Sequence, residues 1–125
     1  MSTRALLIVT ALLEMGTGVA LLIVPSLTAE LLLGEGLSQA PAHVVARVAG
    51  AALTSVAVAC WLARNAEHGV QSCLVAGILI YNVAVPVLLI HGWIALSLHG
   101  LGLWPATLLH TALAVWCIAC LRPSR

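Results

Sequence analysis

The chain has 125 residues, of which 62% are hydrophobic and only 7% are charged, and its formal net charge is +1. Soluble domains carry about a quarter charged residues, so this composition argues against an ordinary soluble protein. All five basic residues are arginines, and they form no basic run. The chain therefore lacks the sequence features of a nucleic-acid-binding protein and of a polybasic lipid-binding surface.

Four apolar stretches, each about 17–21 residues long, can cross a hydrocarbon core about 30 Å thick as helices. They are residues 5–24, 42–62, 70–90 and 105–121. Together they use most of the chain and leave no room for a soluble domain. We therefore expect one transmembrane domain over residues 1–125, an all-α, up-down bundle of four membrane-spanning helices.

The first apolar stretch follows Arg4, and over Ala5–Leu13 it resembles a signal peptide. Glu14 interrupts this run, and no clean small-x-small cleavage site follows, so we interpret it as the first membrane helix. An ionisable side chain near the middle of a membrane helix costs roughly 2.5–3.5 kcal/mol on insertion scales. Such a residue usually has a partner or a function, which makes Glu14 the first candidate site residue.

The three connections differ in character. Residues 25–41 begin with a proline and then an apolar run, which predicts a short interfacial helix at about 26–33, ended by Gly34. Residues 63–69 form a tight polar turn. Residues 91–104 contain three glycines but are unusually apolar. They fit either an extension of the third helix beyond Pro86 or a segment lying in the membrane interface.

The arginines predict the orientation. Arg4, Arg64, Arg122 and Arg125 fall on one side of a four-span chain, whereas the other two connections contain no arginine or lysine. The positive-inside rule then places both termini in the cytoplasm, as in a multi-pass protein of the inner membrane.

Four polar residues on four different helices fall in the outer half of the expected bundle: Glu14, Arg47, Asn82 and His110. Counted from the outer helix ends, Glu14 and Asn82 lie at nearly equal depth, about 15 Å down, and the other two about 8 Å down. We expect Glu14 and Arg47 to form a buried ion pair. The Asn82 amide and the His110 imidazole would complete its hydrogen bonds. Neighbouring side chains that would contact a ligand bound there are Thr10, Thr17, His43, Thr54 and Tyr81.

Histidines and cysteines suggest further chemistry. His110 lies inside the membrane, and His43 lies about one helical turn shallower, so a bis-histidine haem is one interpretation.

Cys117 and Cys120 form a CxxC, the spacing of thiol redox pairs, although they lie toward the reducing cytoplasm. Residues three apart are also simply neighbours on a helix. We expect no metal site and no obligatory cofactor.

The stretch from Leu12 to Thr17 resembles the small multidrug transporters, which are four-helix chains with a proton-exchanging carboxylate in the first helix. That resemblance implies proton-coupled transport through Glu14. The sequence departs from the family in the second helix, where Arg47 would neutralise the carboxylate.

Taken whole, the chain resembles the small DoxX-like membrane proteins of bacteria, which implies a four-helix bundle. Some relatives are accessory subunits of membrane redox complexes. The matching motifs are Gly16-x-Gly18 running into Val24-Pro25, Leu31-Leu32-Leu33-Gly34, Ala46-Arg47-x-x-Gly50-Ala51-Ala52-Leu53, Trp61-Leu62-Ala63-Arg64, Tyr81-Asn82-Val83-Ala84, and Leu103-Trp104-Pro105-Ala106 with His110.

Three functions remain open from the sequence. The first is a non-enzymatic accessory or scaffold subunit of a larger membrane complex, or a homo-oligomer, whose polar cluster locks the bundle or lines a small ligand or quinone pocket. The second is a proton-coupled small-molecule transporter that uses Glu14. The third is a membrane redox protein that uses Cys117 and Cys120 or a histidine-ligated haem.

Overall fold

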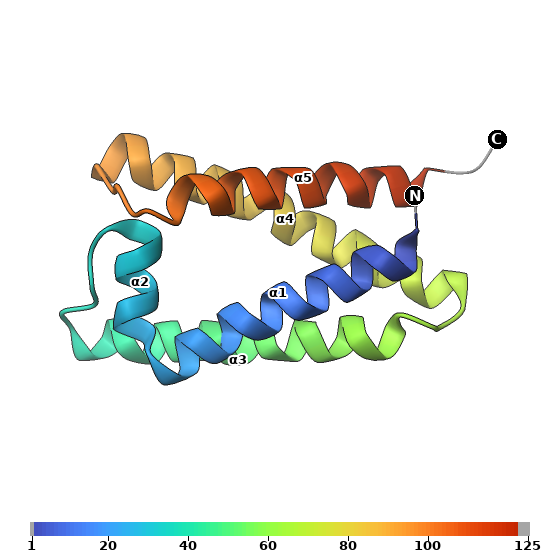
Figure 1. The fold of residues 1–125 in the computed structure, drawn as a ribbon, viewed down its shortest axis with the longest axis horizontal. Coiled ribbons are helices and arrows are strands. Elements are labelled where there is room, and N and C mark those ends of the chain that lie inside the picture. The colour runs from blue at the N-terminus through green and yellow to red at the C-terminus, as the bar shows by residue number, and fades with distance from the viewer. Residues whose placement is uncertain (1, 123–125) are drawn as a thin grey trace.

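A computed structural model describes residues 2–122 and shows an all-helical chain, with no strand in that range. Its five helices are α1 (Thr3–Ile23), α2 (Pro25–Leu33), α3 (Ala40–Ala63), α4 (His68–Leu96) and α5 (Leu103–Leu121). The start of α1 and the end of α5 lie at the same end of the molecule, and the short helix α2 lies at the opposite end (Figure 1). The expected four long helices and one short helix are therefore present.

Local sequence explains where the helices begin and end. The Ser2 side chain accepts a hydrogen bond from the Ala5 N–H and caps α1, and Pro25 occupies the first turn of α2, where its missing N–H is not needed. Gly34 ends α2 in the left-handed conformation, with φ of 88°. Helix α4 continues through the buried Pro86 to Leu96, so the apolar residues after position 90 extend this helix. That result selects the first of the two alternatives for this connection.

The four long helices form two pairs. Helix α1 packs mainly on α3 and α4 packs mainly on α5, whereas contacts between the two pairs are few. The α1–α3 contact is very close because Gly18 and Gly50 face each other. A Cβ added to Gly18 would lie 2.8 Å from the Gly50 carbonyl oxygen, and one added to Gly50 would lie 2.7 Å from the Gly18 carbonyl oxygen. Small residues at a crossing let helix backbones approach in this way.

The two pairs meet at both ends of the molecule. At the end that holds the start of α1, which we call the core end, buried apolar residues of all four long helices pack together: Leu6, Leu7, Ala11, Cys60, Ala63, Val75, Ile78, Leu113 and Cys117. At the other end, the α2 end, the α4–α5 connection binds the C-terminal turn of α2 through backbone hydrogen bonds. The His99 N–H donates to Leu33 O at 3.1 Å and the Gly102 N–H to Leu31 O at 2.8 Å.

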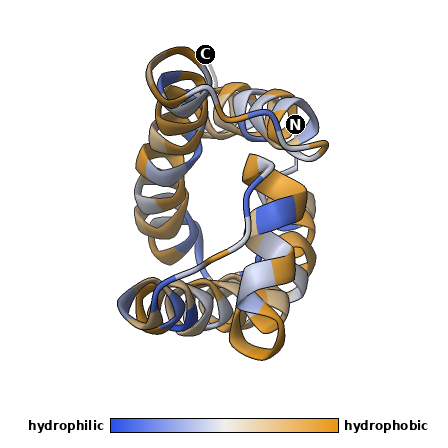
Figure 2. Ribbon diagram, turned by 90° about the vertical axis from the view of Figure 1, so that its left-hand side faces the viewer, coloured by the Kyte–Doolittle hydropathy of each residue, from blue (hydrophilic) through white to orange (hydrophobic). Residues whose placement is uncertain are grey.

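The surface of the molecule suits a hydrocarbon environment. Helices α1, α3, α4 and α5 are long and apolar enough to cross a membrane. Large apolar side chains are exposed along each of them, and hydrophobic colours appear on all sides of the molecule when it is viewed from the α2 end (Figure 2). An aqueous protein rarely exposes apolar surface on this scale, so these features are those of a multi-pass membrane protein.

Candidate functional site

Glu14 lies inside the molecule, where its side chain reaches Tyr81 of α4. Thr10, Glu14 and Gly18 are buried at successive i, i+4 positions, and Glu14 retains only 2% of its accessible surface. Thr17 was expected on the same face but is exposed. It instead lines a cavity of about 340 Å³ beneath α2, together with Thr28 and Gly102.

Tyr81 connects Glu14 to the other helix pair. The Tyr81 hydroxyl on α4 donates a hydrogen bond to Glu14 Oε2 at 3.2 Å. The second carboxylate oxygen, Glu14 Oε1, is buried without a hydrogen-bond partner among the described residues, and so is Thr10 Oγ1 one helical turn away. Buried polar atoms are nearly always satisfied in native proteins, so two unpartnered oxygens on one face mark a place that a further group can occupy.

Asn82 and His110 form the second half of the site. Asn82 is fully buried, and its Nδ2 donates to Ile78 O at 2.8 Å. The Asn82 Oδ1 must therefore accept from His110 Nδ1, which lies 2.7 Å away, so this histidine nitrogen carries a proton. The Tyr81 ring meets the His110 ring edge-on, with centroids 5.3 Å apart. Glu14, Tyr81, Asn82 and His110 thus form one connected group, which we call the interior polar cluster.

Arg47 does not join this cluster, so the predicted ion pair with Glu14 is wrong. Its side chain is exposed on α3 and makes no hydrogen bond or ion pair within residues 2–122. The contact between Gly18 and Gly50 explains why. Glu14 lies four residues from Gly18 toward the core end, and Arg47 lies three residues from Gly50 toward the α2 end. These seven residues of helical rise separate the two backbone positions by about 10 Å along the helix axes.

Two further expected ligand contacts also lie away from the cluster. His43 Nε2 lies 3.0 Å from Leu37 O, so this imidazole holds the connection between α2 and α3. Thr54 Oγ1 donates to Gly50 O at 2.8 Å, within the α1–α3 crossing. Of the five expected contacts, Tyr81 is part of the cluster, and Thr10 lies beside it.

The thiol pair lies at the core end. Cys117 is fully buried in the core beside Cys60, and Cys120 is half-buried at its edge. Within residues 2–122, no group of three or more histidine, cysteine or acidic side chains is placed to hold a metal ion.

A groove between α3 and α4 leads to the cluster. It has a volume of about 370 Å³, its walls are almost entirely apolar, and Tyr81 is one of its lining residues. Both helices are long and apolar enough to cross a membrane, and the groove is lined by middle turns of each, so in a bilayer it would lie at the level of the hydrocarbon. A carboxylate, a phenol, an amide and an imidazole are thus gathered inside the bundle, next to this apolar groove. Such a group of side chains can bind a proton or a small hydrogen-bonding molecule.

No family model, curated protein or solved structure matches the chain.

Proposed function

We propose that this chain is a proton-coupled carrier of small molecules in the cell's inner membrane, with Glu14 as the residue that takes up and releases the proton. The observation that carries the proposal is the burial of Glu14 with no cationic partner in residues 2–122. The sequence had offered Arg47 as a permanent counterion, which would have made the carboxylate a structural group. Without that counterion the Glu14 carboxylate is free to take up and release a proton.

The physical argument concerns the cost of an isolated charge. A carboxylate removed from water needs a proton, a cation or a hydrogen-bond donor as its counterpart. Tyr81 supplies a donor to Oε2 only, so Oε1 remains for a proton or for a donor group on the transported molecule. Binding at one oxygen atom makes the proton and the cargo alternatives, which is what coupling between them requires.

Infrared spectroscopy of the purified protein in lipid nanodiscs tests the role of Glu14 without knowledge of the cargo. The other acidic residues, Glu30, Glu35 and Glu67, are all exposed, so a carboxyl band that exchanges slowly in heavy water belongs to Glu14. We expect this band to change with pH and to vanish in Glu14→Gln. It should remain in the matched variant Glu67→Gln and in Arg47→Met. A pH-dependent slow-exchanging band that survives in Glu14→Gln, or no such band in the native chain, contradicts the proposal.

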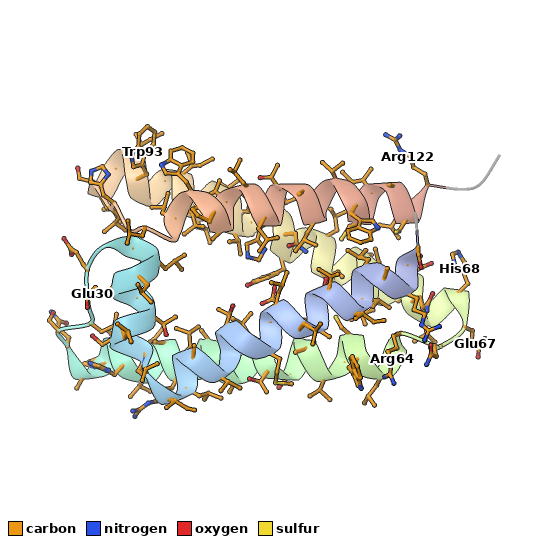
Figure 3. The ribbon with its side chains drawn as sticks, viewed as in Figure 1. Glu30, Arg64, Glu67, His68, Trp93 and Arg122 are labelled. Carbon is orange, nitrogen blue, oxygen red and sulfur yellow. The ribbon has the colours of Figure 1, made fainter. Side chains whose placement is uncertain are left out.

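We also propose that the core end faces the cytoplasm. Arg64 and Arg122 lie at this end and Glu30 at the opposite end (Figure 3), and the Arg64 guanidinium stacks over the Trp61 ring at 4.1 Å. A cationic end with an aromatic anchor suits the cytoplasmic interface. Alkaline phosphatase inserted between Glu35 and Gln39 should be active, and phosphatase fused to the C-terminus inactive. The reverse pattern would overturn the orientation.

An accessory or scaffold subunit is the second candidate, and the outer face of α3 favours it. Ala51 and Ala52 are exposed there, Ser55 and Ala59 continue the small-residue surface into the groove with α4, and small side chains allow another helix to approach closely. The resemblance to DoxX-like proteins points the same way. Gentle solubilisation of native membranes should then yield the chain in a fixed ratio with a larger complex, whereas recovery of the chain alone would favour the carrier.

A further inference from the structure

The groove between α3 and α4 combines an apolar wall with a single polar end. Its volume of about 370 Å³ falls in the range of small-molecule sites, roughly 300–1,000 Å³. Among its lining residues only Ser55 and Tyr81 carry hydroxyl groups. The Ser55 hydroxyl donates to Ala51 O at 2.9 Å within its own helix, and among the described residues no hydrogen bond links it to a buried, unpartnered group, whereas the Tyr81 hydroxyl is bonded to Glu14. The Tyr81 hydroxyl is then the hydrogen-bonding group that an occupant of the groove meets.

Behind Tyr81 lies the unsatisfied acceptor of the site. The Tyr81 hydroxyl donates to Glu14 Oε2, and Glu14 Oε1 is buried without a partner. The single Tyr81 hydroxyl proton is already donated to Glu14 Oε2, so the polar group of an occupant must itself donate, either to Glu14 Oε1 or to a lone pair of the Tyr81 oxygen. A hydroxyl group does this, whereas a plain hydrocarbon chain does not.

We infer that this groove binds a membrane-dissolved amphipathic molecule with a neutral hydroxyl head, whose apolar body lies between α3 and α4 and whose hydroxyl reaches the Tyr81–Glu14 pair. The inference rests on the proposed function and names the class of cargo. A neutral head is selected because the molecule must enter sideways from hydrocarbon, where a charged head is costly. The cargo hydroxyl and the proton then compete for the same carboxylate.

Gly77 offers a direct way to close the groove. It lines the groove, and a Cβ added there would meet nothing within 4 Å. Gly69 on the same helix has equally open surroundings but does not line the groove. Gly77→Leu should therefore fill the groove, while Gly69→Leu introduces the same side chain elsewhere. Ala59→Leu narrows the groove from the α3 side and serves as a second closing variant.

The experiment uses the full chain in nanodiscs and a diazirine-bearing long-chain alcohol as the probe, with the matched diazirine alkane and amine for comparison. Crosslinks located by mass spectrometry should fall on the groove-lining residues of α3 and α4. Labelling by the alcohol should exceed labelling by the alkane about fivefold, the factor that one hydrogen bond provides. It should fall several-fold in Gly77→Leu and Ala59→Leu but not in Gly69→Leu. Tyr81→Phe should remove the preference for the alcohol.

Several outcomes would overturn the inference. Equal labelling by alcohol and alkane identifies the occupant as a lipid chain, and crosslinks to another copy of the chain identify a dimer contact. Stronger labelling by the amine shows a cationic cargo. Unchanged labelling in both closing variants shows that the probe binds elsewhere. If any of these occurs while the infrared band of Glu14 is present, the carrier function stands and only the cargo class fails.

Discussion

Replacing Gly18 with alanine is expected to destabilise the protein by about 1–3 kcal/mol, the usual cost of overpacking a well-packed contact. The added Cβ would lie 2.6 Å from Thr54 Oγ1 and 2.8 Å from the Thr54 backbone nitrogen. The threonine hydroxyl can turn away, but the backbone of α3 cannot. Helices α1 and α3 must then separate at their crossing. Unfolding in detergent, followed by tryptophan fluorescence, measures the loss.

Gly16→Ala is the matched control for this prediction. Gly16 lies two residues away on the same helix, and a Cβ added there would meet nothing within 4 Å. Alanine is a better helix former than glycine by up to about 1 kcal/mol, so Gly16→Ala should be neutral or stabilising. Equal effects of the two variants would show that the Gly18–Gly50 contact does not hold α1 against α3.

The number and lengths of the helices could be predicted because they follow from local composition. A membrane helix needs about 20 apolar residues, and the expected stretches agree with the helices within about two residues at each end, except that α4 continues past the expected position 90 to Leu96. The end of α4 was harder to predict because His91, Gly92 and Trp93 suit a helix, a loop and an interface equally well. The helix ends where Ser97 adopts the left-handed conformation and the Leu98 N–H donates back to Gly92 O at 3.2 Å, and the connection that follows binds α2.

The candidate site could be predicted in part. Counting residues from the helix ends correctly placed Glu14 and Asn82 inside the bundle, because depth depends only on the helical rise. The same count cannot give the axial offset between two helices, which the Gly18–Gly50 contact determines. That offset removes Arg47 from the site. Tyr81 was expected only as a possible ligand contact and not as a member of the cluster. The sequence signal for its role was that it is the single tyrosine of the chain and stands next to Asn82.

Asn82 and His110 should show strong energetic coupling. Asn82→Leu leaves the His110 Nδ1–H without its acceptor inside the bundle, and His110→Phe leaves Asn82 Oδ1 without its donor. Each single change should cost about 1–3 kcal/mol because a half-removed buried hydrogen bond strands a polar atom. The double variant removes both polar groups at once. It should therefore be less destabilised than the sum of the singles by about 1–2 kcal/mol, within the range measured for contacting residues.

The control for this cycle pairs Asn82→Leu with His91→Phe. His91 is exposed on α4 nearer the α2 end, and no hydrogen bond joins it to Asn82 in the described part of the chain. Its effect should add to that of Asn82→Leu within about 0.5 kcal/mol. If the stability losses of Asn82→Leu and His110→Phe were also additive, the hydrogen bond between these two residues would contribute no net stability between α4 and α5. The interior polar cluster would then reduce to the Glu14–Tyr81 contact, and the infrared band of Glu14 should be unchanged in His110→Phe.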